Sequence, residues 1–373
     1  MARARIGGDG RRGTPQRPPP YGRHTSAAMT QTLPGAGHRP QSAGLASPSV
    51  AIVIPAYNEE HFIGACLESC IRQTSMPDEI IVVNNRSTDN TAAIVRRFHL
   101  HNPHVDLRLL DQDEYQGIAP TRNRGFDAVR SDIIGRIDAD SVIPTDWVET
   151  IRRRFQDRAV DALTGPVRYY DMPWQEPVFR LDRAVRARLH RRATDQRFLL
   201  GANMAIRTRA WQAVRHLTRL DLDDRLHEDI DLAVTLFKNN FEIAYEPTLV
   251  AGVSGRRVEC RAGDFYRYAT RYLRTTKAHN VSSHPALLTI LILLVGYLPV
   301  RTLRFFYDVE NKRFTLVKLR DRLHSMGVTT RRGRKPGPAA ARIDGPPASS
   351  RPRRPAVADH QPEQPDVPHR RAA

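Results

Sequence analysis

Two short acidic segments carry the side chains best suited to chemistry. Asp138 and Asp140 flank Ala139 at the end of an apolar stretch, and Glu228 and Asp229 open a second stretch with helical spacing. Carboxylates at a strand end can hold a hard divalent cation, Mg²⁺ or Mn²⁺, whose coordination is completed by phosphate oxygens and water. A carboxylate in the second segment can take a proton from an alcohol, although acids in a first helical turn often only interact with the helix dipole. Either function depends on where the fold places these segments.

Apolar runs alternate with helical patterns from residue 49 onward. Continuous apolar runs predict buried strands over residues 50–54, 80–83, 105–110 and 133–137. Apolar residues at helical spacing predict helices over 59–73, 92–98 and 121–129, the second preceded by N-cap residues at 87–89. This alternation predicts βαβ crossovers and a mostly parallel α/β sheet. Ligands gather at the carboxyl ends of such strands, so the polar segments 55–59, 84–89 and 138–140 are the candidate site.

Several other kinds of site are disfavoured. No GxGxxG motif follows the first strand and no GxxxxGK[ST] motif occurs, which argues against a usual dinucleotide fold and a P-loop NTPase. Cys66 and Cys70 share an apolar helix face and are interpreted as core residues. His227 is interpreted as a supporting or surface residue in preference to a metal ligand. Three cysteines in the chain exclude a disulfide framework and indicate a reducing compartment.

The formal net charge of +18 is concentrated at the two ends. Two thirds of it lies in residues 1–48 and 329–373, which are rich in Pro, Gly and Ser. Such segments bury too little apolar surface to fold, so both are predicted to be disordered tails, and Met29 is an alternative start to Met1. Arginine dominates the basic residues of core and tails alike, so we interpret the bias as a consequence of genome composition. It therefore gives no reason to expect a nucleic-acid partner. Between the tails we expect one domain over 49–255 and a helical region over 256–328.

The predicted helical region combines a basic amphipathic helix with an apolar run. Phe265, Tyr268, Ala269 and Tyr272 recur on one face and basic residues fall opposite, a pattern typical of a helix on an anionic membrane surface. The run at 286–300 reaches about 22 Å as a helix, short of the ~30 Å hydrocarbon layer. The alternative is a helix pair packed on the core. Because residues 1–30 lack the apolar stretch of a secretory signal, we expect a cytoplasmic protein, peripheral on the inner face of the plasma membrane.

Six segments in order provide a more specific signal. They are Val53–Glu60, Val82–Asp89, Arg122–Gly125, Ile137–Asp140, Gly201–Ala205 and Glu228–Leu232. Together they resemble the inverting family 2 glycosyltransferases of GT-A fold, over roughly residues 49–250. The resemblance implies a Rossmann-like, mostly parallel sheet flanked by helices, and an enzyme that transfers sugar from a nucleotide-diphospho-sugar to an acceptor hydroxyl.

The resemblance also implies roles for individual residues. Asp138 and Asp140 would hold Mg²⁺ or Mn²⁺ on the donor diphosphate, and Asp229, beside Glu228, would be the general base. The sugar and the acceptor would be bordered by Gly201, Ala202 and Asn203. The donor nucleotide would be bordered by Pro55, Ala56, Tyr57, Glu59, Asn84, Asp89, Arg122 and Ala139.

Departures from the family pattern leave the substrates open. Many members carry Asp where this chain has Asn84, whose amide oxygen still accepts a hydrogen bond, so a uridine donor is preferred over guanosine or thymidine without being required. Residues 266–274 lack the QxxRW motif of processive members, which predicts a single transfer to a glycan or lipid-linked acceptor in glycolipid or cell-envelope glycan synthesis. The alternatives are a polyprenyl-phosphate sugar synthase, whose anionic acceptor needs no base, and a non-catalytic sugar-nucleotide-binding or scaffold protein.

Overall fold

A computed structural model describes residues 47–193, 197–309, 311–317 and 320 of the chain. The two predicted tails and the question of the start residue lie outside these residues, apart from residues 47 and 48. The chain divides into two compact units, residues 1–312 and 313–373. Strand β11 (Arg313–Phe314) belongs to the second unit, and every other element belongs to the first.

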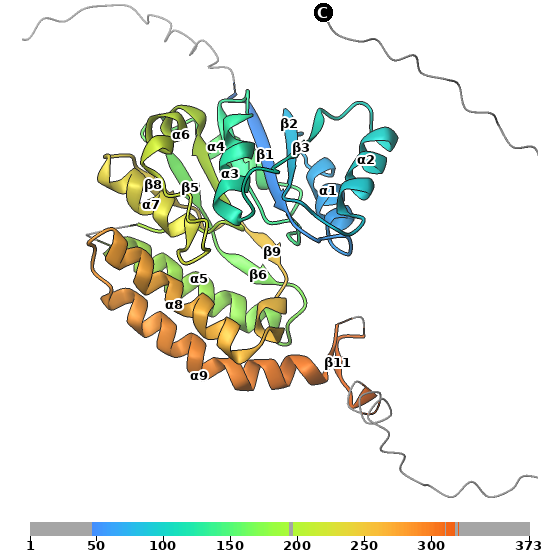
Figure 1. Ribbon diagram of the computed structural model, residues 1–373, viewed down its shortest axis with the longest axis vertical. Coiled ribbons are helices and arrows are strands. Elements are labelled where there is room, and N and C mark those ends of the chain that lie inside the picture. The colour runs from blue at the N-terminus through green and yellow to red at the C-terminus, as the bar shows by residue number, and fades with distance from the viewer. Residues whose placement is uncertain (1–46, 194–196, 310, 318–319, 321–373) are drawn as a thin grey trace, which may run out of the picture. The chain divides into compact units, whose positions relative to one another are not determined.

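A seven-stranded sheet forms the centre of the first unit, as far as the chain is described (Figure 1). In spatial order its strands are β3 (Leu107–Asp111), β2 (Glu79–Asn84), β1 (Val50–Ala56), β4 (Ile133–Arg136), β7 (Met204–Arg207), β5 (Ala162–Thr164) and β8 (Ile243–Tyr245). The first four run parallel, and β5 and β8 form a further parallel pair. Only β7 is antiparallel to its neighbours β4 and β5. The predicted mostly parallel α/β sheet is therefore confirmed. A second, two-stranded sheet pairs β6 (Val167–Tyr169) with β9 (Ala251–Val253).

Both faces of the central sheet are covered, because its strands alternate apolar side chains between two cores. Ile52 and Ile54 of β1 point into one core and Val53 into the other. The first core is closed by α1 (Ile63–Ile71), α2 (Thr91–His101) and α4 (Trp147–Arg154). The second is closed by α3 (Ile118–Asp127), α6 (Thr208–Val214) and α7 (Glu228–Lys238), with the short helix η1 (Arg215–Leu217) after α6. Burial on both sides explains the continuous apolar runs of the sequence.

The element boundaries differ from the predicted ones where local hydrogen bonds form turns. The third strand begins at Leu107, because the N–H of Val105 bonds to Asn102 O and the N–H of Leu107 to Val105 O. The first helix begins at Ile63, after a turn closed on Glu59 O. Helix α2 is N-capped by Asn90, not by residues 87–89. Asp89 nevertheless accepts a hydrogen bond from the Thr91 N–H, so it satisfies one donor of the first turn.

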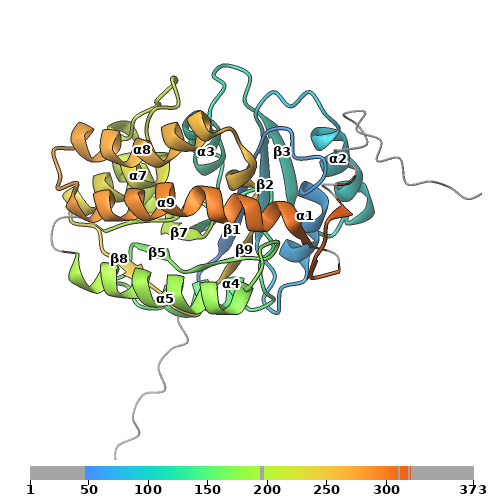
Figure 2. The same ribbon diagram turned by 90° about the horizontal axis from the view of Figure 1, so that it is seen from below.

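Three further helices lie together at one end of the sheet (Figures 1 and 2). They are α5 (Gln175–Arg192), α8 (Ala262–Ala278), which follows the short helix η2 (Arg256–Glu259), and α9 (His284–Phe306), which leads into β10 (Tyr307–Asp308). Helix α8 was expected to present its apolar face to a membrane, but Phe265 and Ala269 are buried and Phe265 stacks on Tyr297 of α9. The apolar face of α8 is therefore used for packing. None of the described helices, α9 included, has the length and apolarity that crossing a bilayer requires.

Helix α9 is anchored to the domain by a buried ion pair near its carboxyl end. Arg304 donates to the Asp171 carboxylate at 2.9 Å and to the Asp171 carbonyl at 2.9 Å, and it also bonds Glu259 at 2.8 Å. The Asp171 carboxylate additionally accepts from Ser254 Oγ and from the Gly255 N–H. Because every charge in this group has partners, the pair can remain buried at little net cost, and α9 is held close to the segment that joins β9 to α8.

Candidate active site

The loops that follow β1 and β2 are tied into one surface. Asn58, whose φ of 54° is left-handed, accepts the Thr88 N–H through its side chain at 2.8 Å and donates its own N–H to Ser87 Oγ. The Glu59 N–H donates to Thr91 Oγ1 at 2.8 Å. Pro55 and Ala56 are buried in the end of β1, whereas the side chain of Tyr57 is 47% exposed. Of the predicted nucleotide-contacting residues here, Tyr57 is the one that offers a free surface.

The residues predicted to contact the nucleobase, Asn84 and Asp89, form hydrogen bonds within the protein. Asn84 donates to Asp111 Oδ1 at 2.9 Å and accepts the Ser87 N–H. Both oxygens of Asp89 are engaged, one by Thr91 and the other by the Glu60 N–H. Although burial acts to raise the pKa of Asp89, these hydrogen bonds lower it. The exposed carboxylate of Asp111, which sequence reasoning missed, lies in register beside Asn84 at the end of β3. A carboxylate therefore lies next to the position where many family members carry Asp and this chain carries Asn84.

An acidic cluster follows β4. Asp138 is 43% exposed, Asp140 is 12% exposed, and Ala139 between them is buried. A turn aligns the two acids, because the Ser141 N–H bonds to Asp138 O and Ser141 Oγ bonds to the Asp138 N–H. Glu59 approaches from the β1 loop, and Arg256 bonds both Asp140 (2.9 Å) and Glu59 (2.5 Å). Burial and the nearby charge of Asp138 raise the pKa of Asp140 to about 6.

These acids fit a hard divalent cation. Burial, and after it the charge of Asp138, raises the pKa of Asp140, and Glu59 Oε2 is buried and has no hydrogen-bond partner among the described residues. All of the potential ligand atoms in this cluster are carboxylate oxygens, which suit Mg²⁺ or Mn²⁺. Within the described residues, no three His, Cys, Asp or Glu side chains already surround a common point. Asp138 and Asp140 are thus placed to hold a cation only together with ligands from elsewhere.

A buried arginine joins this cluster to the second acidic segment. Arg136, at the end of β4 and 2% exposed, forms ion pairs with Asp138 at 3.1 Å and with Glu228 at 2.7 Å. Arg122, which is fully buried, donates to the Glu228 carbonyl at 2.6 Å and lies 3.1 Å from its carboxylate. The resemblance assigned Arg122 to the nucleotide. The structure instead uses it to hold Glu228, because full burial leaves it no accessible surface.

Asp229 is held beside this pair by two backbone groups. Its Oδ2 accepts the Gly201 N–H at 2.9 Å and its Oδ1 accepts the Ile230 N–H at 2.8 Å. Burial and the charge of Glu228 raise the pKa of Asp229 to about 6. A carboxylate with this pKa is ionised at neutral pH and is a better proton acceptor than an exposed aspartate. The role of general base that the family resemblance implies for Asp229 stays a prediction, and its raised pKa is compatible with that role.

The segment at 201–203 supports the site more than it borders a substrate. A Cβ added at Gly201 would lie 2.1 Å from Arg136 Nη1, so only glycine leaves room for that guanidinium. Asn203 was predicted to border the sugar, but it is fully buried: its amide donates to Pro166 O and Leu249 O and accepts the indole N–H of Trp147. Ala202, which is partly exposed, is the residue of this segment that can contact a substrate.

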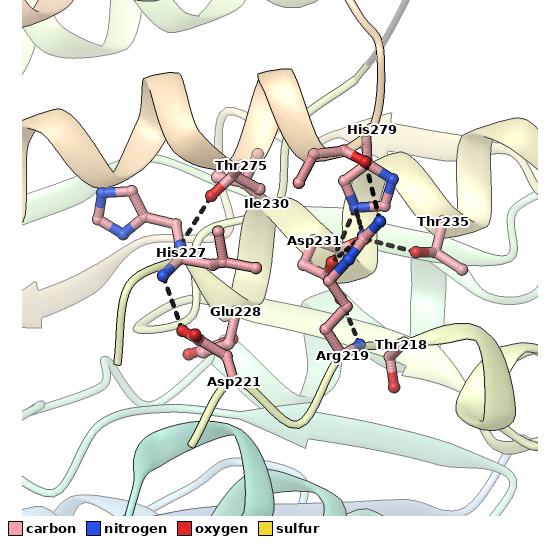
Figure 3. Close-up of polar contacts among 12 residues, drawn as sticks. Thr218, Arg219, Asp221, His227, Glu228, Ile230, Asp231, Thr235, Thr275 and His279 are labelled. Carbon is pink, nitrogen blue, oxygen red and sulfur yellow. Dashed lines mark hydrogen bonds and ion pairs between the residues drawn. The ribbon is translucent and has the colours of Figure 1, made fainter. Parts of the chain in front are cut away.

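The helix that carries Asp229 is fastened to α8 by a polar network (Figure 3). Asp231 accepts from Arg219 at 2.8 Å and contacts His279 Nε2 at 2.7 Å. Burial acts to raise the pKa of Asp231, but the hydrogen bonds from His279 and Arg219 lower it. His227 donates its N–H to Thr275 Oγ1, and burial lowers the pKa of its ring to about 4. His227 is thus a neutral supporting residue, as the sequence interpretation favoured.

The architecture and these motifs agree with known proteins. Residues 51–216 match the family described as "Glycosyl transferase family 2". This segment is a family 2 glycosyltransferase domain. Glycosyltransferase GlyG from Streptococcus pneumoniae is 30% identical over 125 residues, which cover 34% of this chain and 41% of that protein. Glycosyltransferase GlyA of the same organism is 31% identical over 136 residues, which cover 36% of this chain and 19% of that protein. The chain thus spans less than half the length of these curated relatives.

The fold of the glycosyltransferase domain is also shared with a solved structure. Mannosyltransferase PcManGT from Pyrobaculum calidifontis, in complex with GDP-Man and Mn2+, superposes with a TM-score of 0.51 at 20% identity, covering 76% of this chain and 81% of that one. This similarity establishes a GT-A fold for the chain and supports the sheet arrangement on which the acidic segments lie.

The close approach at Gly201 generates a first prediction. In Gly201→Ala, the added methyl group must displace the Arg136 guanidinium, so the free energy of unfolding should fall by about 1–3 kcal/mol, as for overpacked cores. Urea denaturation measures this. Gly263→Ala is the matched control, because nothing lies within 4 Å of its added Cβ on α8, and alanine in a helix gains up to about 1 kcal/mol over glycine. Equal stability of Gly201→Ala and the native chain would show that Arg136 is not confined as described.

Proposed function

We propose that this protein transfers a single sugar from a nucleoside-diphosphate sugar to the hydroxyl of a glycan or lipid-linked acceptor, with inversion at the anomeric carbon. The observation that carries the proposal is the bridge made by Arg136. This buried arginine forms an ion pair with Asp138 of the acidic cluster on one side and with Glu228, the neighbour of Asp229, on the other. A site for the leaving diphosphate and a base for the acceptor are thereby held in fixed relation on one domain.

Asp229 supplies the base in this proposal. The acceptor hydroxyl, whose pKa lies far above neutrality, must lose its proton as it attacks. The raised pKa of Asp229 matches this task near neutral pH. Attack from the side opposite the diphosphate inverts the anomeric centre and requires no covalent nucleophile. Glu228, held by Arg122 and Arg136, keeps Asp229 in position and contributes to its raised pKa.

The acidic cluster would hold the divalent cation through Asp138 and Asp140. When bound, Mg²⁺ or Mn²⁺ supplies charge stabilisation to the departing diphosphate. The relative from P. calidifontis, of the same fold, forms a complex with GDP-Man and Mn2+. For recognition of the nucleobase, the pair Asn84 and Asp111 offers both a hydrogen-bond donor and an acceptor. We retain the preference for a uridine donor.

A panel of UDP-, GDP- and dTDP-sugars, each with and without Mn²⁺, tests the donor. At 100 times its Kd, a ligand should add about 2.7 kcal/mol to the free energy of unfolding, which a thermal-shift assay detects. We expect a Mn²⁺-dependent rise in Tm with a UDP-sugar, and loss of the Mn²⁺-dependent part in Asp138→Asn. Folded protein whose Tm responds to none of the donors would contradict a nucleotide-sugar site.

Asp229→Asn tests the base. Removing a general base should lower kcat by about 10²–10⁴-fold while the donor-induced thermal shift persists. In the native enzyme, the rate should fall as pH drops through about 6, because Asp229 becomes protonated there and only its ionised form accepts a proton. The control Glu68→Gln removes a carboxylate from an exposed pair with Arg72 and should leave rate and pH profile unchanged. Full activity in Asp229→Asn would remove the base assignment.

We further propose that the protein acts on the inner face of the plasma membrane. Support comes from exposed apolar side chains on the two outer helices. Leu291, Ile292, Val295 and Leu298 of α9 are 58–69% exposed, and Val178, Leu181, Val185 and Leu189 form a second stripe on α5. Six arginines of α5 accompany its stripe, a combination that favours an anionic lipid surface. The sequence analysis did not single out the α5 stripe, although its four residues recur at helical spacing.

Co-sedimentation with phosphatidylglycerol vesicles tests the membrane proposal. Replacing Val295 and Leu298 by Asp should reduce vesicle binding at least tenfold, because each buried aliphatic side chain contributes about 1.5–3 kcal/mol to partitioning. Both side chains are more than 65% exposed, so the fold should survive. Leu100→Asp, at a 76% exposed position on α2, is the control and should bind normally. Unchanged binding by the double variant would contradict docking through α9.

A further inference from the structure

A polar cleft that includes no residue of the acidic cluster lies along one side of α8. This α8 groove has a volume of about 680 Å³ and is lined by the segment 223–225, by η2 and its flanks, and by α8 itself. Its walls carry five guanidinium groups, those of Arg225, Arg257, Arg267, Arg271 and Arg274. The established family and the proposed base do not require this concentration of positive charge.

The acids of the α8 groove neutralise only part of this charge. Asp224 pairs with Arg271, Asp264 with Arg267, and Asp223 lies 3.4 Å from Arg225. Arg257 and Arg274 are exposed and pair with no carboxylate of the described residues. The guanidinium of Arg274 is fixed by the carbonyls of Arg225 and Arg267, each at 2.9 Å. That of Arg257 lies over the Tyr268 ring, 4.7 Å from its centre. Two oriented cations thus face the groove with donors to spare.

The floor of the groove adjoins the helix that carries the base. Tyr268 lines the groove, and its ring meets the His227 ring edge-on with centroids 4.9 Å apart. His227 directly precedes the pair Glu228 and Asp229. Burial raises the pKa of Tyr268 to about 12; Arg257 opposes this rise and the charge of Asp229 adds to it, so both groups act on the same ring. The groove also adjoins the acidic cluster along the chain. Arg257 directly follows Arg256, which donates a hydrogen bond to Asp140 of that cluster.

We propose that the α8 groove binds a phosphate group carried by the acceptor, close to the hydroxyl that Asp229 deprotonates. Guanidinium groups are the usual protein partners of phosphate, and two that lack carboxylate partners can bind one phosphate through several charge-assisted hydrogen bonds. In the proposed function, the diphosphate of the donor binds at the acidic cluster. The phosphates of the two substrates would therefore bind at different sites. The groove is much larger than a phosphate ion and leaves room for the group that bears it. This inference rests on the proposed transfer function and names its acceptor class.

The test compares phosphate binding by the native full-length chain and by the double variant Arg257→Gln, Arg274→Gln. Inorganic phosphate and a short, soluble alkyl phosphate are titrated calorimetrically at low and high salt. We expect the double variant to lose at least tenfold in affinity, and native binding to weaken with salt. Arg72→Gln is the matched control, because Arg72 is an exposed arginine directly after α1 that pairs with Glu68; this variant should bind as the native chain does. Native-like binding by the double variant, or no binding by the native chain, would overturn the proposal.

A second arm identifies the source of the phosphate. Vesicles of phosphatidylcholine, with and without phosphatidic acid, are compared with the soluble phosphates. Preference for phosphatidic acid that depends on Arg257 and Arg274 indicates a lipid-borne phosphate, whereas binding of soluble phosphate alone indicates a water-soluble acceptor. If the double variant still bound phosphatidic acid, and its affinity for soluble phosphate were also unchanged, the groove would not be the phosphate site.

Donor binding separates this proposal from the proposed function. The double variant should keep the Mn²⁺-dependent thermal shift with nucleotide-sugars, because its changes lie outside the acidic cluster. Groove-dependent phosphate binding without any donor response in the native chain would contradict the transfer function and leave the phosphate site standing. The reverse result, a donor response without groove-dependent phosphate binding, would leave the transferase and remove the phosphate-bearing acceptor.

Discussion

The candidate site depends on charges that are buried and paired around Arg136. This arginine sits at the end of β4, inside the domain, where an unpaired guanidinium would be very costly. Glu228 and Asp138 neutralise it, Arg122 shares Glu228, and Gly201 provides the space that the guanidinium fills. Glu228 is the shared partner of the two buried arginines, so its removal would leave Arg122 without a carboxylate and Arg136 with Asp138 alone. The network therefore fixes β4, α7 and the segment before β7 relative to one another, and the position of Asp229 follows from that arrangement.

The sheet supplies the platform for this network. Because β1, β2, β3 and β4 are parallel, the loops that follow them meet at one edge, where Glu59, Asn84, Asp111 and Asp138 come together. The antiparallel strand β7 brings Gly201 and Ala202 to the same edge from the opposite chain direction. Gly125 allows α3 to pack closely, since an added Cβ would lie 2.4 Å from Val53 of β1. This close packing places Arg122 within reach of Glu228.

The helices α8 and α9 extend the site beyond the family domain. The apolar face of α8 is used for packing on α9, so the face that remains is the basic one, and it forms the groove beside Tyr268. Helix α9 in turn exposes the apolar residues that α8 does not cover. A charged cleft and an apolar surface are thus divided between two packed helices. The ion pair of Arg304 with Asp171 and the contact of Asp231 with His279 tie this pair of helices to the domain.

The sequence by itself determined the first four strands, their alternation with helices, and the acids Asp138, Asp140 and Asp229. These features are local: apolar runs reflect burial on both faces of a strand, and short motifs keep their spacing in any fold. Only the tertiary structure decided what each acid contacts. In the sequence, Arg136 is part of an apolar strand and Asp111 a strand-end residue, because their partners Glu228 and Asn84 lie 92 and 27 residues away. Arg257 and Arg274 are members of a general arginine bias until the structure places them together in one groove. The same limit explains why Asn203 and Arg122 were expected at a substrate. A polar side chain near a motif can be buried or exposed, and packing between distant segments decides which.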